Sequence, residues 1–415
     1  MKSENNFVLG TLDEVAEITM GQSPKGETVS SISGVPLLNG PAEFGDYFPV
    51  PHQYTSDPKR MAKKGDLLFC VRGSTGKMNW ANQDYAIGRG LASIRSKFGQ
   101  EVNNYLRALL EMKVEELKSS EVGSVITGIK KDDLFKLQIP ILEKKDLEKM
   151  NFIISQFDEK IETIQTLNEE LNTLLTKIFQ SWFIDFKFNK KVGLKDNEIS
   201  KFYKKYYETD IGEIPEDWRL SKIGDELEVM LGGTPSRKID DYWGGDIGWI
   251  NSGEINKFRI INPTEYISKE GYESSSTKLL PKRTTLIAIT GATLGQVSLN
   301  EIEVCTNQSV IGIIGSNNIC SEYVYLWIKS TIDKLIANQT GGAQQHINTG
   351  NVKEHLVLIP PQGLLKKFEN IAKPIFDKIE LNVKELEKLK ELRKLIIPKI
   401  VYGNINISNF NETTL

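Results

Sequence analysis

Apolar residues at intervals of three and four predict two long helices. From about Lys144 to Phe183, neither proline nor glycine interrupts the chain. The apolar seam of this segment is Ile161, Ile164, Asn168, Leu171, Leu175, Ile178 and Trp182. A second segment, from about Leu364 to Ile397, carries the stripe Ile379, Val383, Leu386, Leu389, Leu392 and Ile396. Both patterns are typical of a coiled-coil seam, in which a polar member such as Asn168 can fix the register.

A helix of about 30 residues spans roughly 45 Å, which is more than one small domain can cover. We therefore expect the two seams to pair as an antiparallel coiled coil, with a pseudo-two-fold axis between the halves of the chain. The alternative is that each helix packs only on its own domain. Pro374 predicts a kink or restart in the second helix, and Pro398 predicts a shortened seam.

Short, continuous apolar runs predict buried strands. LLFCVRG (67–73) and TLIAITG (285–291) both end in glycine, which is typical of a strand that enters a tight turn. Residues 104–118 and 322–337 have apolar residues at helical spacing. Each half of the chain is thus expected to contain a mixed α/β domain of about 150 residues.

Four blocks of sequence occur twice in the same order. Residues 21–24, 67–78, 124–142 and 156–171 are matched by 232–235, 285–296, 344–362 and 375–392. Gly73 and Gly76 correspond to Gly291 and Gly295, with a slip of one residue. A repeat of more than 200 residues indicates a duplicated domain. Apolar and glycine positions persist between the copies while polar positions change, as expected for one fold with two different surfaces.

The predicted fold is mixed α/β (α+β), with two duplicated domains joined by two antiparallel coiled-coil helices. The predicted segments are a first domain (1–145), a first helix (146–186), a linker (187–210), a second domain (211–363), a second helix (364–404) and a tail (405–415).

Composition narrows the functional classes. The chain has 415 residues and a net charge of −3, which argues against a protein that simply coats nucleic acid. We find no apolar stretch of the roughly 18 residues that a membrane span needs and no leader, so we expect a cytoplasmic protein. The three cysteines, Cys70, Cys305 and Cys320, and the three histidines are too scattered to predict a metal site.

Several segments together resemble one protein family. They are SWFIDF (181–186), ETDIGEIPEDW (208–218), GGAQQHINTGNVKEHLVLIPP (341–361) and the two G-x-[ST]-P turns. With the order domain, helix, domain, helix, they resemble specificity subunits of type I restriction–modification enzymes over nearly the whole chain. The resemblance implies that each domain is a target-recognition domain for double-stranded DNA, similar to that of adenine-N6 methyltransferases. It also implies that the helices set the half-site spacing.

The resemblance further implies partner subunits that carry the chemistry. Two modification (methyltransferase) subunits would dock on the helices and carry S-adenosylmethionine. Restriction (translocase) subunits would use ATP and Mg²⁺, and this chain itself would bind no cofactor. The sequence fits the expectation that this chain binds no cofactor, because we find neither a GxxxxGK[ST] phosphate loop nor an adenine methyltransferase motif. The turn GSTGK (73–77) lacks the phosphate-loop spacing and is expected to be a structural turn or a close approach to DNA.

Polar residues beside the predicted turns are candidates for reading DNA, since Arg and Lys suit guanine whereas Asn and Gln suit adenine. In the first half they are Arg72, Lys77, Arg89, Lys130 and Lys131. In the second half they are Thr290, Gln296, Gln344, Gln345, His346 and Lys353. Because they differ between the copies, we expect a bipartite, asymmetric site with half-sites about one helical turn (~34 Å) apart or slightly more.

Two other classes of function stay open. A duplicated protein-binding scaffold would use the coiled coil as a spacer, and salt-sensitive binding to DNA would argue against it. A stand-alone methyltransferase or nuclease is disfavoured by the missing motifs.

Overall fold

The computed structural model describes residues 8–45, 48–119, 128–187, 206–209, 212–337, 347–403 and 405. The chain forms two compact units. The first comprises residues 1–163 and 388–415, and the second comprises residues 164–387. Each unit therefore contains part of both long helices, α4 (Lys144–Phe179) and α9 (Gln362–Val401).

The first unit is built on two sheets. The four-stranded antiparallel sheet has the order β2 (Ala16–Met20), β10 (Leu91–Ser96), β7 (Leu67–Cys70), β8 (Met78–Trp80). The five-stranded sheet has the order β3 (Val29–Ser30), β5 (Gln53–Thr55), β4 (Val35–Leu38), β9 (Tyr85–Ile87), β6 (Met61–Ala62). A separate antiparallel pair joins β1 (Val8–Thr11) to β11 (Gln138–Ile141). The helices are α1 (Leu12–Val15), α2 (Asn103–Ser119) and α3 (Lys131–Phe135).

The second unit repeats this plan. Its antiparallel sheet has the order β15 (Glu228–Leu231), β22 (Val310–Ile314), β19 (Thr285–Ala288), β20 (Val297–Leu299). Its other large sheet has the order β17 (Glu265–Ile267), β16 (Trp243–Ile250), β21 (Val304–Thr306), β18 (Leu279–Leu280). Two antiparallel pairs join β14 (Arg219–Lys222) to β23 (Leu356–Ile359) and β12 (Tyr206–Tyr207) to β13 (Ile214–Pro215). The helices are α5 (Ile223–Glu226), α6 (Lys269–Glu273), α7 (Ser321–Ala337) and α8 (Thr349–Glu354).

The repeated topology confirms the duplication that the sequence predicts. β2-β10-β7-β8 corresponds to β15-β22-β19-β20, and in each unit the other sheet contains one parallel pair, β4–β9 or β16–β21. The helices predicted at 104–118 and 322–337 are α2 and α7.

β7 and β19 are buried on both faces, which explains their continuous apolar sequences. Leu67 and Phe69 pack into the core that contains α2, whereas Leu68 and Cys70 pack toward the five-stranded sheet. In the second unit, Ile287 packs toward α7, while Leu286 and Ala288 pack toward β21. Successive side chains of a strand point to opposite faces, so a strand between two layers has no polar face.

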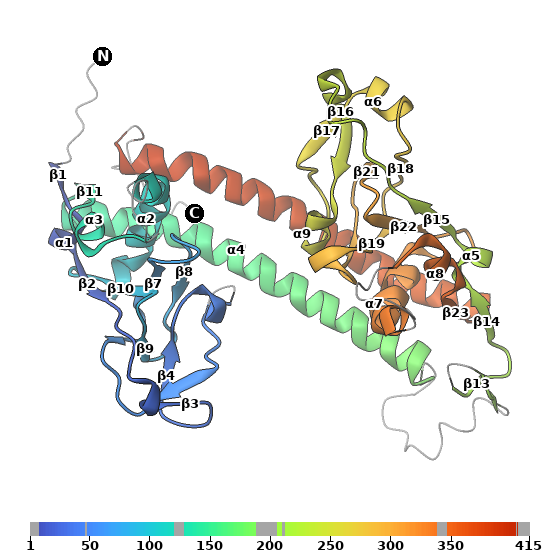
Figure 1. The fold of residues 1–415 in the computed structure, drawn as a ribbon, viewed down its shortest axis with the longest axis horizontal. Helices are drawn as coiled ribbons and strands as arrows, with labels where there is room; N and C mark the ends of the chain where they lie inside the picture. The colour runs from blue at the N-terminus through green and yellow to red at the C-terminus, as the bar shows by residue number, and fades with distance from the viewer. Residues whose placement is uncertain are drawn as a thin grey trace. The chain divides into compact units, whose positions relative to one another are not determined.

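α4 and α9 pack together as an antiparallel pair (Figure 1). In the second unit, Asn168 of α4 lies beside Asn382 of α9, while Phe179 lies beside Phe368. α4 ends in a π-helical turn, Gln180–Ile184, whose Phe183 is fully buried.

The restart expected at Pro374 does not occur, and Pro398 does not end the helix. The helix continues through Pro374 and Pro398 to Val401 without a restart. A proline inside a helix costs about 3 kcal/mol. Near Pro374, the side chains of Phe368, Ala372 and Phe376 are fully buried. Near Pro398, Ile397 and Val401 are buried in the core of the first unit, so tertiary packing outweighs the local cost at both places.

Candidate nucleic-acid interface

Four loops of the first unit meet at one end of its four-stranded sheet. The turn 71–77 follows β7, and the Val71 amide donates a hydrogen bond to the Gly90 carbonyl at 2.9 Å. The Val71 carbonyl accepts from the Ile129 amide, also at 2.9 Å. The Gln22 amide, after β2, donates to the Ile87 carbonyl at 2.9 Å. We call the loops 21–23, 71–77, 88–90 and 128–130 the first junction.

The first junction presents four of the predicted DNA-contacting residues. Arg72, Lys77, Arg89 and Lys130 are all exposed. The carboxylates of Asp66 and Asp84 pair elsewhere, with Arg95 and Lys63. Within the described residues, no carboxylate pairs with the side chain of Arg72, Lys77 or Arg89. Lys131, in the first turn of α3, lies with its ammonium 4.9 Å from the ring centre of Phe135.

The second unit has the same arrangement of loops. The Ile289 amide donates to the Ser309 carbonyl at 3.0 Å, and the Ile289 carbonyl accepts from the Ile347 amide at 3.1 Å. The Gly233 amide donates to the Thr306 carbonyl at 2.8 Å. We call the loops 232–234, 289–296, 307–309 and 347–348 the second junction.

The second junction contains two predicted residues and one that sequence reasoning missed. Thr290 and Gln296 are half-buried in the turn after β19. Gln308 is exposed, and its Oε1 accepts a hydrogen bond from Thr234 Oγ1 at 2.5 Å. Gln308 follows Arg89 by 219 positions, the offset of the repeat near this point, so extending the alignment of the two copies would have found it.

The other predicted residues lie elsewhere. The Lys353 side chain lies against Gly224 of α5, before β15, whereas the second junction includes the turn after β15. Gln344, Gln345 and His346 lie outside the described residues.

Two kinds of feature are missing from the described residues, a cluster of metal ligands and a membrane-spanning helix. Among them, no group of three or more His, Cys, Asp or Glu side chains is placed to hold a metal ion. None of the described helices has an apolar stretch that would cross a lipid bilayer. The junctions present exposed and half-buried polar side chains on tight loops, an arrangement that can contact the edges of bases or phosphates.

Comparison with known proteins gives the family. The model of the type I restriction modification DNA specificity domain matches twice, over residues 4–173 and 215–391. These matches cover most of the chain and coincide with its two copies. The chain belongs to the type I restriction–modification DNA specificity family. Specificity subunits are non-catalytic, so the prediction of a DNA-recognition subunit without enzymatic activity is confirmed.

Relatives and a solved structure agree with this assignment. The type I restriction enzyme MjaIX specificity subunit of Methanocaldococcus jannaschii is 24% identical over 354 residues, which cover 84% of this chain and 79% of the relative. The HindI specificity subunit of Haemophilus influenzae is 23% identical over 404 residues, covering 84% and 88%. The crystal structure of an S subunit from M. genitalium shares the fold, with a TM-score of 0.58, 16% identity and 97% of each chain covered.

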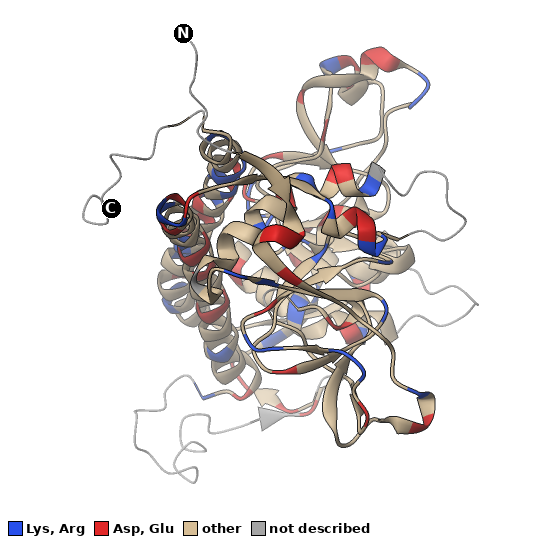
Figure 2. Cartoon of the chain, turned by 90° about the vertical axis from the view of Figure 1, so that its left-hand side faces the viewer, with Lys and Arg blue, Asp and Glu red and all other residues tan. Residues whose placement is uncertain are grey.

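The long helices of this specificity subunit carry charges of both signs. Lys, Arg, Asp and Glu are interspersed along α4 and α9 (Figure 2). In the first unit, Arg393 of α9 pairs with Asp158 of α4 at 2.7 Å and with Glu111 of α2 at 2.5 Å. Leu392, which the predicted stripe placed against α4, is instead 46% exposed. The helix presents Arg393 to α4 at this point because two acids are available there.

The other predicted seam residues lie as follows. Ile161, Ile164, Asn168, Leu175, Ile379, Val383 and Leu386 are buried, and Leu171, Ile178 and Leu389 are half-buried. The buried Asn168 accepts a hydrogen bond at Oδ1 from Asn382 Nδ2 at 2.8 Å. Asn382 is thus the hydrogen-bond partner of Asn168, a pairing that the sequence pattern did not predict.

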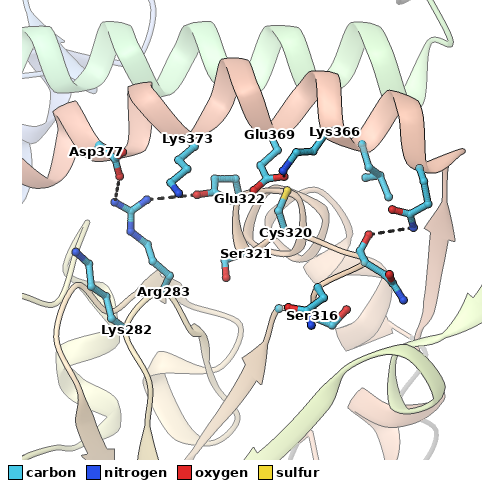
Figure 3. A pocket seen from close by; sticks show the side chains of 15 residues that line it. Lys282, Arg283, Ser316, Cys320, Ser321, Glu322, Lys366, Glu369, Lys373 and Asp377 are labelled. Atoms are coloured by element: carbon cyan, nitrogen blue, oxygen red, sulfur yellow. Dashed lines mark hydrogen bonds and ion pairs between the residues drawn. The ribbon is translucent and has the colours of Figure 1, made fainter.

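In the second unit, α9 is attached to the sheet by a cluster of ion pairs. Arg283, which has a positive φ of 67°, extends from the turn after β18 toward Asp377 of α9 (Figure 3). Its Nη2 lies 2.9 Å from Asp377 and 3.0 Å from Glu380, and its Nε lies 2.7 Å from the fully buried Glu301. Arg283 and Asp377 also border a polar cavity of about 850 Å³.

Two carboxyl groups in this cluster have shifted pKa values. Burial raises the pKa of Glu301 to about 7, although Arg283 and Arg259 lie beside it. Burial also acts to raise the pKa of Glu380, but hydrogen bonds from Lys282, Lys384 and Arg283 hold it at about 2. Glu380 is therefore ionised at neutral pH and attaches α9 to the turn before β19.

The segment SWFIDF closes α4 against the second unit. Phe183 packs in edge contacts on Trp218, Tyr323 and Phe368. Next to it is a second cavity, of about 840 Å³, bordered by Trp327 and His355. Burial, with a contribution from Lys334, lowers the pKa of His355, whose Nε2 lies 3.0 Å from Thr331 Oγ1.

Proposed function

We propose that each sheet domain of this specificity subunit reads one half of a bipartite, asymmetric DNA site through its junction. The paired helices set the spacing of the half-sites and dock two methyltransferase subunits. The observation that carries the proposal is the duplication itself, because two copies of one scaffold present different side chains at matched loops.

The chemistry of the junctions supports a role in base reading. Exposed Arg and Lys donate to guanine and phosphate, and amides form paired hydrogen bonds with adenine. Both types of side chain stand on turns that the backbone holds rigidly, through Val71 in the first unit and Ile289 in the second. Rigid presentation favours binding, since little backbone entropy is lost when such turns contact DNA.

The exposed apolar residues of the helices support docking of partner subunits. Leu381 is 62% exposed on α9 in the second unit, and Leu395 is 61% exposed on α9 in the first unit. Leucines at helical positions normally face a core, and exposed ones at the middle of α9 and near its C-terminal end fit contact surfaces. S-adenosylmethionine, ATP and Mg²⁺ would belong to the modification and restriction subunits, and the assembly would work in the cytoplasm, where the DNA is.

Methylation mapping tests the proposal. The chain is expressed with its modification subunits in a host without other adenine methylation, and the genome is read by long-read sequencing. We expect a split motif methylated in both halves. Exchange of residues 1–143 for those of another specificity subunit should change one half only. A folded, co-purifying complex that produces no motif would instead favour a protein-binding scaffold.

A further inference from the structure

The two junctions differ in charge at positions that the backbone matches. In the first unit the Cys70 amide donates to the Lys77 carbonyl at 2.9 Å, and the Gly76 amide donates back to Cys70 at 2.9 Å. In the second unit the Ala288 amide donates to the Gln296 carbonyl at 3.0 Å, and the Gly295 amide donates back at 2.9 Å. Lys77 and Gln296 are therefore equivalent positions.

Two more pairs follow from the same hydrogen bonds. Val71 and Ile289 each precede a polar residue, so Arg72 corresponds to Thr290. The amides of Val71 and Ile289 donate to the carbonyls of Gly90 and Ser309, so these two residues are equivalent. The residues before them, Arg89 and Gln308, are therefore equivalent as well. At all three positions the first unit has a cation and the second has a neutral hydroxyl or amide.

The arginine that follows the turn 232–234 does not restore the missing charge. Arg237 is the first arginine after the turn 232–234, but its guanidinium pairs with Glu265 at two oxygens, one 3.0 Å away. The same guanidinium lies 3.5 Å from the ring centre of Trp243. An arginine that is both paired and stacked has few donors left for DNA.

The amides of the second junction retain hydrogen-bonding capacity. Gln296 Oε1 is buried and has no hydrogen-bond partner among the described residues. The Gln308 amide is oriented by Thr234, which donates to its Oε1. Asn348 is the equivalent of Lys130. Its side-chain oxygen is already used, because it caps α8 by accepting from the Asn351 amide. Gln296 and Gln308 are thus the side chains of the second junction that are left to contact bases.

We infer that the two junctions read chemically different half-sites, an inference that rests on the proposed function. The first junction holds guanine and phosphate through Arg72, Lys77 and Arg89. The second reads adenine through Gln296 and Gln308. The unpaired Oε1 of Gln296 is buried, so this side chain turns outward to accept from N6 while its Nε2 donates to N7. At the matched positions, the cations that attract DNA are thus concentrated in the first junction.

Selection from randomised duplex DNA tests this inference. The full chain is purified with its modification subunits, and bound sequences are enriched and read for wild type, Lys77→Gln and Gln296→Lys. Lys77→Gln should lower the preference for one guanine in the half-site of the first domain about tenfold. Gln296→Lys should lower an adenine preference about as much in the other half-site only.

Lys63→Gln is the matched control, because Lys63 precedes β7 rather than following it and pairs with Asp84. It removes the same charge and should leave both half-sites unchanged. A split wild-type motif that both junction variants leave intact would overturn the inference while the proposed function stands. The absence of any wild-type motif would overturn both. Thermal unfolding of each variant checks that the comparison is made between folded proteins.

Discussion

In the first unit the turn after β7 packs on α2, and in the second unit the turn after β19 packs on α7. Both turns use a glycine with positive φ, Gly76 at 86° and Gly295 at 82°. A Cβ atom at Gly76 would lie 2.5 Å from Val114, and one at Gly295 would lie 2.5 Å from Ile336. The side chains on the same turns, Lys77 and Gln296, differ in charge.

This difference shows which positions the fold constrains. Any side chain at Gly76 or Gly295 would meet a helix, so both copies keep these glycines. The polar side chains next to them are exposed (Lys77) or partly exposed (Gln296), and replacing one polar side chain with another there costs little stability. The two copies could therefore acquire different recognition surfaces without loss of the scaffold.

The largest expected effect tests whether the two turns are equally constrained. Gly76→Ala should cost about 2–4 kcal/mol, from the positive φ plus a clash with the branched Val114. Gly295→Ala should cost about 1–2 kcal/mol, because only the flexible end of Ile336 has to move. Urea unfolding of the full chain measures both values.

Gly73→Ala and Gly291→Ala are the controls for this measurement. Both glycines have positive φ, 80° and 68°, but a Cβ at either would meet nothing closer than 3.9 Å. Each should cost about 1 kcal/mol, the backbone effect alone. The comparison breaks down if Gly76→Ala costs no more than Gly73→Ala.

The second prediction contrasts how the two units hold α4 against α9. Arg393→Met should cost about 2 kcal/mol at low salt, since it leaves Asp158 and Glu111 without their cation. Asn168→Ala should cost about 1–2 kcal/mol, because Asn382 remains buried without a partner. In 1 M NaCl the cost of Arg393→Met should shrink and that of Asn168→Ala should not. Equal salt responses would show that the contacts do not differ as described.

The third prediction concerns the loss of stability at low pH that arises from Glu380 in the second unit. The folded pKa of Glu380, about 2, lies below the usual value of 4.5. As pH falls from about 4.5 toward 2, the unfolded chain binds the proton first, so this group's contribution to stability is lost. We expect that loss to be about 1–2 kcal/mol. Glu380→Gln should be less stable at pH 7 and less sensitive to acid.

The exposed Glu391 on the same helix provides the control. Glu391→Gln should retain the wild-type decline in stability between pH 4.5 and 2, measured as the midpoint of thermal unfolding. If Glu380→Gln also retains the full decline, the ion-pair cluster does not hold α9 in the way described.

The smallest expected effect sharpens the contrast in charge between the junctions. Arg72→Gln should reduce the slope of log K against log salt by about 0.9, the effect of one lost phosphate contact. Thr290→Arg should increase the slope by about the same amount. Titration of a fluorescent duplex with the complex of this chain and its modification subunits gives both slopes. No change for either variant would remove these positions from the DNA surface.

Much of the architecture follows from local patterns in the sequence. Continuous apolar runs identified β7 and β19, three-and-four spacing identified α2, α7 and the long helices, and the repeated blocks identified the duplication. Each of these features depends on neighbouring residues or on comparison of one half with the other. Candidate residues in the tight turns could also be predicted from the sequence, because glycine pairs such as Gly73 and Gly76 mark the turns.

By itself, then, the sequence determined the two copies, their long helices and the turns that carry the candidate readers. Only the tertiary structure decided which groups meet: Asn168 with Asn382, Arg393 with Asp158, and Arg283 with Glu301 and Glu380. It also decided that α9 continues through its prolines. The physical reason is that periodicity reports which face of an element is apolar, whereas polar partners and packing energies depend on other elements of the fold, up to 235 residues away in the sequence.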